Sequence, residues 1–259
     1  MSNQSEMYPD GVALVVGGSG GVGRVICKQL ADVNVRVVLT YNNNSARAEE
    51  LAAEIVAEGG QAEIAQLNMD NLDCIKTTVE GLVRDYGRLH SVFIATGFDI
   101  PQIQVRDVTP ELWKKVLRAD AEGVFNIVYA TLPHLREGGG GSYVHISSAA
   151  LQRFADLDIM SVAPKAAIEE LMKGIAKEEG KFGIRANSIA IGVIETGIFL
   201  RLQEEGVFDE AWQSKVKAML PLNRFGQPEE VARMAVFLGS NHAAYTTGQL
   251  IPVDGGFGV

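Results

Sequence analysis

The hydrophobic pattern alternates short apolar runs with longer stretches of helical periodicity. Several runs are rich in β-branched residues and nearly continuous, which is typical of strands covered on both faces. Strands are expected at residues 12–16, 35–40, 62–67, 91–95, 142–147, 185–190 and 249–253. Helices are expected at 23–31, 46–58, 72–86, 110–135, 159–179 and 229–238. This alternation with short links predicts one α/β domain over 1–259, a Rossmann-type, doubly wound parallel sheet flanked by helices.

Two segments do not follow this pattern. Residues 192–225 have weak periodicity and carry Gly192, Gly197, Gly206 and Pro221 among apolar side chains. Such a segment after a late strand is typical of a mobile substrate lid, while an ordinary packed helix pair explains it equally well. Residues 1–9 are expected to form a flexible N-terminus.

A glycine-rich turn follows the first expected strand. Residues 17–23 read Gly-Gly-Ser-Gly-Gly-Val-Gly and open the first expected helix. Gly17 permits the turn, Gly21 lets the backbone approach a phosphate, and Gly23 lets helix and strand pack closely. The position between a strand and a helix predicts a dinucleotide pyrophosphate site. The site also includes Ser19, Gly20 and Val22.

The end of the second expected strand bears on the choice of cofactor. An acidic residue there would bind a ribose 2′-hydroxyl and repel a 2′-phosphate. Residues 39–47 read Leu-Thr-Tyr-Asn-Asn-Asn-Ser-Ala-Arg and contain no carboxylate. Tyr41, Asn42 and Asn43 are therefore candidate contacts, and NADP(H) is favoured over NAD(H). If the loop is only a polar connection with a helix N-cap at Asn44 or Ser45, the choice stays open.

Charge and composition exclude several classes. The chain has 259 residues, 47% hydrophobic and 21% charged residues, and a net charge of −9, which argues against nucleic-acid or anionic-membrane partners. No apolar run reaches the ~18–20 residues of a membrane span, and no signal peptide is evident, so a cytoplasmic location is expected. Cys27 and Cys74 are expected to be reduced. The lack of a His/Cys/carboxylate cluster at ligand spacing predicts no metal.

Over residues 10–259 the chain resembles the short-chain dehydrogenase/reductase family, most closely its 3-oxoacyl-carrier-protein reductase branch. The matches are the glycine turn, Ile-Ser-Ser at 146–148, Lys165, Arg-Ala-Asn-Ser-Ile-Ala-Ile-Gly-Val-Ile-Glu-Thr at 185–196, and the tail segments 221–230 and 247–256. The resemblance implies a seven-stranded sheet, a nicotinamide cofactor, and a tetramer built on the faces of the fourth and fifth helices and on C-terminal contacts. It also implies cofactor contacts from Asn68, Met69, Ala95, Thr96, Gly97, Lys165, Gly192, Ile194 and Thr196.

The departures from the family gather in the active site. The family's catalytic tyrosine aligns with Ser161, and its helix-4 asparagine aligns with Asp120. Its Asn-Asn-Ala-Gly turn reads Ile-Ala-Thr-Gly at 94–97, the proline of its Pro-Gly turn is Ile191, and its Asp-Val adenine contact is Asn-Met at 68–69. Five departures together indicate natural divergence rather than one engineered change.

The resemblance assigns roles to the residues that remain. Ser148 would hold a substrate carbonyl, Lys165 would bind the ribose, and Thr196 would hold the nicotinamide carboxamide. Three proton donors are then open: water on Ser161, Lys165 itself, or a protonated Asp120. The alternatives are that Asp120 is a charged partner of Lys165 or Arg118, that Ser161 only fills space, and that Lys165 is a solvated helix residue.

Four other ionisable residues are interpreted as structural. His90 and His145 lie in expected strands and are expected to be packed or hydrogen-bonded. Asp156 and Asp158 lie between Ser148 and Ser161 and are expected to be solvated loop or N-cap residues.

Three functions follow. The first is NADP(H)-dependent reduction of a ketone, such as a 3-oxoacyl or polyketide-like substrate that a carrier could hold, by a route without the usual tyrosine. The second is a non-catalytic, cofactor-binding subunit that pairs with an active reductase in a hetero-oligomer. The third is a non-redox lyase or dehydratase with Lys165 or Asp120 as base. A homo-oligomer, either tetramer or dimer, is expected for the first.

Overall fold

The computed structural model describes residues 7–98 and 100–259. It contains one parallel sheet of seven strands in the order β3-β2-β1-β4-β5-β6-β7. The strands are β1 (Val12–Val16), β2 (Arg36–Tyr41), β3 (Ala62–Gln66), β4 (Leu89–Ile94), β5 (Gly141–Ser148), β6 (Ile184–Ile191) and β7 (Leu250–Val253). Every expected strand is present, with ends shifted by at most two residues. The doubly wound fold class is confirmed.

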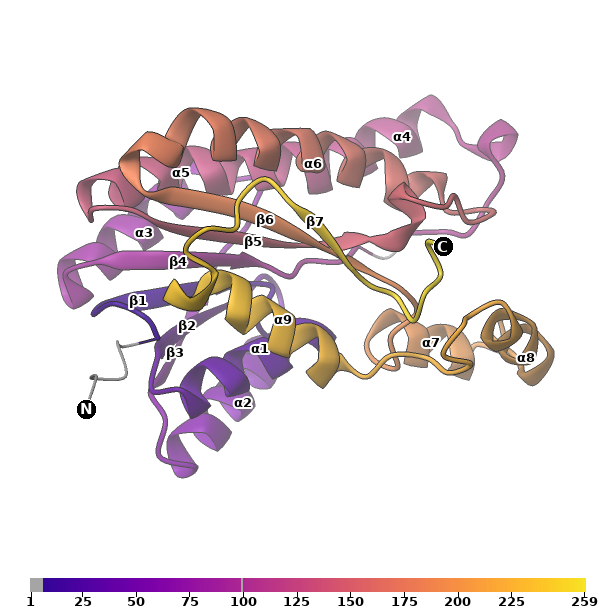
Figure 1. Cartoon of the computed structure of the whole chain (residues 1–259), viewed down its shortest axis with the longest axis horizontal. Coiled ribbons are helices and arrows are strands. Elements are labelled where there is room, and N and C mark those ends of the chain that lie inside the picture. Colours follow the sequence, from indigo (N-terminus) through magenta and orange to yellow (C-terminus); the bar gives the residue numbers. More distant parts are fainter. Residues whose placement is uncertain (1–6, 99) are drawn as a thin grey trace.

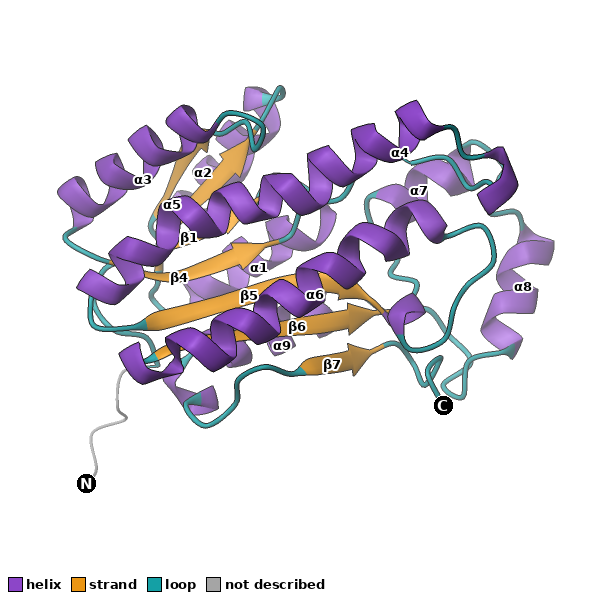
Figure 2. Ribbon diagram, turned by 90° about the horizontal axis from the view of Figure 1, so that it is seen from above, coloured by secondary structure: helices purple, strands orange, loops and turns teal. Residues whose placement is uncertain are grey.

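Helices cover both faces of the sheet (Figures 1 and 2). One layer holds α1 (Gly21–Asp32), α2 (Ser45–Ala57) and α9 (Pro228–Gly239); the other holds α3 (Leu72–Tyr86), α5 (Gly123–Glu137) and α6 (Ile159–Glu179). Three shorter helices, α4 (Pro110–Leu117), α7 (Ile198–Glu204) and α8 (Glu210–Ala218), lie toward the carboxyl ends of the strands. Two apolar cores result, one on each face.

The central strand explains why both faces must be covered. All five residues of β1 are buried: Ala13 and Val15 pack into the core under α1 and α9, whereas Val12, Leu14 and Val16 pack into the core under α3, α5 and α6. Because successive side chains of a strand point to opposite faces, a continuous apolar run requires a layer on each side.

The helix expected at 110–135 is wrong as a single α-helix. It is divided into α4, a π-helical turn over Arg118–Glu122, and α5, which ends at Glu137. A π-turn inserts one extra residue into the helical repeat and is frequent at functional sites. The apolar pattern continues on both sides of the turn, so periodicity did not show the interruption. Asp120 lies inside this turn and is buried.

Arg185 connects the C-terminal segment to the sheet. Its guanidinium donates to the backbone carbonyls of Leu238 at 2.8 Å, Ser240 at 2.9 Å and Thr246 at 3.2 Å. These carbonyls belong to the end of α9 and the chain beyond it, where a helix leaves its last carbonyls without partners of its own. The Arg-Ala-Asn motif is therefore explained by fold rather than by chemistry.

The N-terminus expected to be flexible, 1–9, falls partly outside the described residues, which begin at 7. Tyr8 is buried, and its hydroxyl donates to the carbonyl of Val236 at 2.6 Å. The described part of this segment is thus packed against α9 rather than free.

Residues 192–225 contain α7 and α8, which pack around an aromatic cluster. Phe199, Phe208, Trp212 and Phe225 form this cluster, with the rings of Phe208 and Trp212 stacked at 3.7 Å. A helix pair with its own small core is present, and lid motion stays a prediction.

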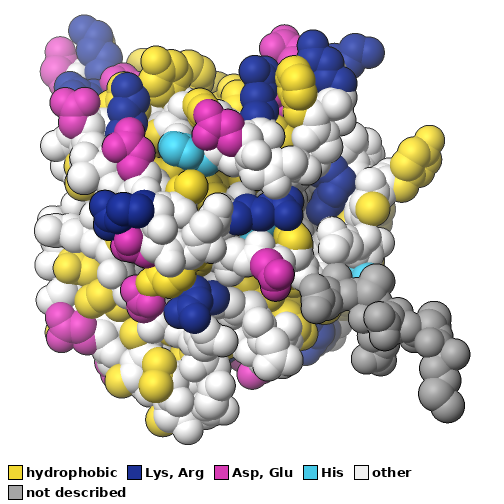
Figure 3. Space-filling model, turned by 90° about the vertical axis from the view of Figure 1, so that its left-hand side faces the viewer, with side chains coloured by type: hydrophobic (Ala, Val, Ile, Leu, Met, Phe, Trp, Pro, Cys, Tyr) yellow, Lys and Arg dark blue, Asp and Glu magenta, His cyan; other side chains and the backbone are white. Residues whose placement is uncertain are grey.

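The surface and the cysteines agree with the composition. On the face at the amino ends of the strands, acidic and basic side chains are interspersed (Figure 3). No helix within the described residues is long and apolar enough to cross a membrane. Cys27 is buried, Cys74 is half-buried, and both are free thiols.

Replacing Arg185 should destabilise the fold. Arg185→Met would remove the side-chain donor of the Leu238 carbonyl and one of the two donors of the Ser240 and Thr246 carbonyls, which also accept from the Ala243 N–H and Asn187 Nδ2. We expect a loss of about 3 kcal/mol in the free energy of unfolding. Urea unfolding followed by circular dichroism measures this loss. Arg84→Met is the matched control because, within residues 7–98 and 100–259, Arg84 pairs only with its exposed neighbour Asp85. This variant should leave the unfolding midpoint unchanged. Equal midpoints for both variants would contradict the role assigned to Arg185.

Candidate active site

The site is built where β1 and β4 lie side by side and their following segments diverge to opposite faces of the sheet. In an open parallel sheet, ligands bind in such a crevice, outside the carboxyl ends of the strands. The chain leaves β1 through the glycine turn, leaves β4 through 95–97, and leaves β6 toward Thr196. These three segments come together.

The contacts at the glycines of the turn show how closely these three chain segments approach one another. A Cβ at Gly21 would lie 2.5 Å from Thr196 Oγ1, and one at Gly23 would lie 2.3 Å from the carbonyl oxygen of Gly17. Gly17 has a φ of +77°, and a Cβ there would lie 2.9 Å from the carbonyl oxygen of Ala95 and 3.1 Å from Thr96 Cγ2. No larger side chain fits without movement, so the sequence assignment of Gly17, Gly21 and Gly23 has a steric basis.

Thr40 positions the turn and was missed by the sequence analysis. It is buried at the end of β2, and its Oγ1 accepts a hydrogen bond from the Gly17 backbone N–H at 3.1 Å. The signal was present as a hydroxyl in the last positions of an otherwise apolar strand. A side-chain acceptor here satisfies a buried amide that strand pairing does not reach.

These residues fit a dinucleotide. The first backbone amides of an α-helix have no acceptor within the helix and carry the positive end of its dipole. In α1 the N-cap is Gly20, which makes no side-chain capping bond, and the first turn contains no acidic residue. Ser19 and Val22 flank this end. The amides are therefore available to the pyrophosphate of a nicotinamide cofactor, and no carboxylate of the first turn opposes it.

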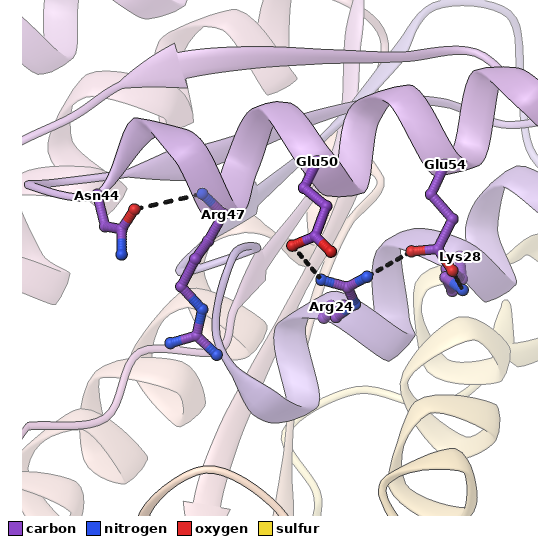
Figure 4. A network of polar contacts seen from close by, with 6 residues as sticks. All are labelled: Arg24, Lys28, Asn44, Arg47, Glu50 and Glu54. Atoms are coloured by element: carbon purple, nitrogen blue, oxygen red, sulfur yellow. Dashed lines mark hydrogen bonds and ion pairs between the residues drawn. The ribbon is translucent and has the colours of Figure 1, made fainter.

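The chain that follows β2 shows which residue caps the next helix. Asn44 is the N-cap of α2, and its side chain accepts from the Arg47 backbone N–H at 3.3 Å (Figure 4). Asn42 and Asn43 are exposed, and Tyr41 is half-buried. The N-cap interpretation is confirmed for Asn44, while the loop residues before it stay open toward solvent.

Two arginines near this loop, Arg24 and Arg47, differ in whether they form ion pairs. Arg24 of α1 pairs with Glu54 and, at 3.7 Å, with Glu50, and Lys28 also pairs with Glu54 (Figure 4). Arg47 is exposed, and its guanidinium has no ion pair among the described residues. It extends from the first turn of α2 away from that network. Arg47 is thus the cation beside this loop that remains open to an anionic ligand.

Lys165 and Asp120 form a buried ion pair. Lys165 Nζ lies 3.6 Å from Asp120 Oδ2, and their side chains are 15% and 6% exposed. Burial raises the pKa of Asp120 above its usual value, while the charge of Lys165 and its hydrogen bond lower it. The interpretation of Asp120 as a charged partner of Lys165 is confirmed. Arg118 instead lies 3.8 Å from Asp70. Lys165 is not a solvated helix residue.

Ser148 and Ser161 lie at the two ends of the loop that joins β5 to α6. Ser148 Oγ accepts from the Ala150 backbone N–H at 3.1 Å, and both serine side chains are half-buried. The Ser161 backbone N–H donates to the carbonyl of Asp158 at 3.0 Å. Ser148 retains its hydroxyl proton for a ligand because it uses only a lone pair in this bond.

Asp158 is the N-cap residue that the sequence indicated, but it is not the solvated residue of the other interpretation. It occupies the N-cap position of α6, yet its side chain makes no capping hydrogen bond and is half-buried. Burial raises the pKa of Asp158 to about 6, against the lowering effects of Lys165 and of a hydrogen bond to Gln102. Asp156, two residues earlier, is exposed as expected. Sequence spacing could have indicated Asp158, because it lies one helical turn before Ser161 and two before Lys165.

The remaining predicted contacts surround the same end of the sheet. Asn68 Oδ1 accepts from the Asp70 backbone N–H at 3.0 Å, and the Met69 carbonyl accepts from Asn126 at 3.0 Å. Gly97 approaches Ile198 of α7, since a Cβ there would lie 3.5 Å from Ile198 Cδ1.

Gly192 and Ile194 have structural reasons of their own. A Cβ at Gly192 would lie 2.9 Å from Asp254 Cα, and the buried Ile194 bridges to Gly226. Their contacts are with the C-terminal chain, and cofactor binding by their backbone stays a prediction.

The histidines are packed as expected. His90 Nδ1 lies 2.9 Å from Ser91 Oγ, and burial lowers the pKa of His90 to about 4. Burial, followed by the charge of Lys165, lowers the pKa of His145 to about 3. Both are neutral at physiological pH. Among residues 7–98 and 100–259, no cluster of three His, Cys, Asp or Glu side chains could hold a metal ion.

Comparison with known proteins agrees with this geometry. The family model described as enoyl-(acyl carrier protein) reductase matches residues 16–258. Versicolorin reductase stcU of Emericella nidulans is 31% identical over 99% of both chains. The 3-oxoacyl-[acyl-carrier-protein] reductase FabG of Thermotoga maritima is 31% identical over 95% of this chain and 96% of its own. Cyclohexanol dehydrogenase of an Acinetobacter species is 32% identical over 98% and 97%.

The fold comparison reaches the same family. A short-chain type dehydrogenase/reductase from Mycobacterium ulcerans superposes with a TM-score of 0.90 at 29% identity, covering 96% of this chain and 90% of that one. The glycine turn, the strand order and the position of Lys165 are all present in this chain. The chain therefore belongs to the short-chain dehydrogenases/reductases, a family of oxidoreductases that use nicotinamide cofactors.

Proposed function

We propose that this protein is an NADP(H)-dependent oxidoreductase that reduces a ketone without the usual tyrosine. The observation that carries the proposal is the buried Lys165–Asp120 pair, held at 3.6 Å near the end of the sheet where the glycine turn meets Thr196. Burying two charges costs free energy that a solvated pair would not, so such a pair at a cofactor site is better explained by chemistry than by stability.

Each part of carbonyl reduction is assigned to a residue that this chain carries. When bound, the reduced nicotinamide supplies a hydride to the carbonyl carbon. Ser148 donates a hydrogen bond to the carbonyl oxygen, Lys165 binds the ribose and adds positive charge, and Thr196 holds the carboxamide. Asp120 pairs with Lys165 and holds its side chain in place. Hydride transfer persists without the tyrosine, because a proton donor typically contributes roughly 10²–10⁴-fold of the rate.

The substrate class is inferred from relatives and from the apolar rim. The names of the relatives point to versicolorin, 3-oxoacyl-[acyl-carrier-protein] and cyclohexanol as their substrates. In this chain, Ile198 and Leu200 of α7 are exposed beside the site, at 43% and 45%. An apolar ketone, either cyclic or carried on an acyl chain, suits this rim.

A second function is favoured by one observation. Ser161 replaces the phenol with a shorter and far less acidic hydroxyl, which suits a cofactor-binding subunit that pairs with an active reductase. Such a subunit would bind NADPH and turn over only with its partner. If Ser161→Tyr creates ketone reduction in a protein that has none alone, this second function is supported.

The cofactor cradle gives the first test. Gly21→Ala places a methyl group 2.5 Å from Thr196 Oγ1 and 3.0 Å from the Gly197 nitrogen, so we expect NADPH binding to weaken at least about tenfold, or 1.4 kcal/mol. Quenching of tryptophan fluorescence and calorimetry measure binding, and absorbance of the nicotinamide with cyclic ketones and 3-oxoacyl thioesters measures turnover. Gly174→Ala is the matched control, since its Cβ would meet nothing within 4 Å.

Measurements of NADPH binding and of ketone turnover distinguish the reductase from the partner subunit. Binding of NADPH with turnover of a ketone supports the reductase, and binding without turnover favours the partner subunit. Binding of neither NADPH nor NADH would overturn both.

Arg47 should decide between the two nicotinamide cofactors. It is exposed in the first turn of α2, beside a loop with no carboxylate, and a guanidinium binds a phosphate through charge-assisted hydrogen bonds. Arg47→Glu should lower affinity for NADPH by about tenfold or more and leave NADH binding nearly unchanged. Arg84→Glu, in the last turn of α3 at the other end of the sheet, is the control. An equal loss for both cofactors would contradict the assignment.

A homo-oligomer is proposed from the outer face of α5. Phe125 and Tyr129 are 51% and 53% exposed, their ring centroids are 6.4 Å apart, and Lys76 lies 5.1 Å from the Tyr129 ring. Large exposed aromatic side chains grouped on one helix face are typical of an interface. Tyr129→Glu should shift the protein to a smaller species in light scattering, whereas Val56→Glu, on the exposed side of α2, should not. A monomeric wild type would refute this interface.

A further inference from the structure

We propose that the Asp158 carboxyl supplies the proton that the missing tyrosine would have given to the substrate oxygen. This assignment rests on the proposed ketone reduction and names a residue for a step that reduction requires. Three observations support it: the place of Asp158 on α6, the surroundings of its side chain, and the unsuitability of the other donors.

The backbone fixes Asp158 at the start of α6. Its carbonyl accepts from the N–H groups of both Ser161, at 3.0 Å, and Val162, at 2.9 Å. Residues three to four apart lie on one face of a helix. Asp158, Ser161 and Lys165 therefore follow one another along the same side of α6, and the charge of Lys165 acts on the Asp158 carboxyl.

The Asp158 side chain does not cap its own helix. An Asp at the N-cap usually accepts a hydrogen bond from the first turn of its helix. Asp158 makes no such bond, although Asp209 at the start of α8 does, accepting from the Trp212 N–H at 2.7 Å. The Asp158 carboxyl instead bonds to Gln102 from the segment that follows β4, and it lies within the electrostatic influence of Lys165.

The charged groups around Asp158 give it a useful acidity. Burial raises the pKa of Asp158 to about 6, and the cation of Lys165 and the hydrogen bond to Gln102 limit the rise. Lys165 is itself neutralised in part by Asp120 at 3.6 Å, from the π-turn. A catalytic acid works best with a pKa near the operating pH, and an ordinary aspartate, near ~3.9, would be almost fully ionised there.

The three donors considered from sequence are less suitable. Water held on Ser161 is far less acidic than a phenol. The Asp120 carboxylate is needed as the direct partner of Lys165, because removing it would leave a buried cation unpaired. Lys165 would lose its charge by donating, at the moment when positive charge stabilises the developing alkoxide. Asp158 can donate without breaking the Lys165–Asp120 pair.

The step balances. The hydride forms the new C–H bond at the carbonyl carbon and leaves the nicotinamide oxidised. The electron pair of the carbonyl π bond takes the proton of Asp158, the carboxyl O–H bond breaks, and its electrons remain on the carboxylate. Water from solvent restores the proton before the next turnover. One carbonyl and one reduced nicotinamide give one alcohol and one oxidised nicotinamide, with one proton consumed from solvent.

The test compares Asp158→Asn with Asp156→Asn, an exposed aspartate of the same loop. Reduction needs the protonated carboxyl, so kcat/KM of the wild type should fall about tenfold per pH unit as the pH rises above about 6. Asp158→Asn should lose this limb of the profile and fall by roughly 10²–10³-fold at pH 6. Asp156→Asn should match the wild type. NADPH binding, measured by calorimetry, should be unchanged in both variants.

A second measurement needs no turnover. In protein labelled with ¹³C at aspartate carboxyls and free of cofactor, one resonance should titrate near pH 6 and be absent from Asp158→Asn. An ordinary titration of Asp158 near pH ~4, or a variant that keeps both the wild-type rate and its pH limb, would overturn this assignment alone. A wild type that binds NADPH and reduces no ketone would overturn the proposed function and, with it, the role of Asp158.

Discussion

The close approach of backbone segments at the carboxyl end of β1 is the constraint on which the candidate site depends. Glycine at 17 and 21 lets the turn press against the chain leaving β4 and against Thr196, where a Cβ would fall 2.9 Å from Ala95 O and 2.5 Å from Thr196 Oγ1. Glycine at 23 lets α1 approach the Gly17 carbonyl oxygen, 2.3 Å from where a Cβ would lie. The contacts at Gly17 and Gly21 bring together segments that are far apart in the sequence. They also leave the first amides of α1 directed at the crevice, where a pyrophosphate finds donors already in position.

The buried cation of Lys165 organises the chemistry beside this cradle. A desolvated ammonium needs a counter-charge, and Asp120 supplies it from a π-turn that places the carboxylate within 3.6 Å. The same cation helps keep His145 neutral and limits the rise in the pKa of Asp158. Burial is the main cause of the pKa shifts of Asp120, His145 and Asp158, and the charge of Lys165 contributes to all three.

The replacement of the family's tyrosine by Ser161 changes both the reach and the acidity of the side chain beside Lys165. A phenol combines a reach of several bonds with an acidity that a nearby lysine can adjust, and serine has neither property. The chain retains the serine at 148, the lysine and the cofactor turn, and it carries an extra half-buried carboxyl one helical turn before the substituted position. The departure from the family therefore lies at its proton donor, while Ser148, Lys165 and the glycine turn, to which we assign carbonyl and cofactor binding, are retained.

Much of the fold and part of the site followed from the sequence. Period-two and period-3.6 patterns are local, so the strands, most helices and the glycine turn could be predicted, with ends within two residues. The spacing from Ser148 to Lys165 and the lack of a carboxylate after β2 are also local, and they pointed to the cofactor region. The Asn44 N-cap was anticipated for the same reason.

Other features depended on contacts between distant segments. The π-turn around Asp120 leaves the apolar pattern intact, and the bond from Gly17 to Thr40 joins residues 23 apart. The acidity of Asp158 depends on burial and on Gln102 and Lys165, which reach it from separate parts of the chain. Sequence alone determined which residues were available for chemistry. Only the tertiary structure decided which of them are desolvated and paired, because dielectric environment and ion pairing depend on packing rather than on order along the chain.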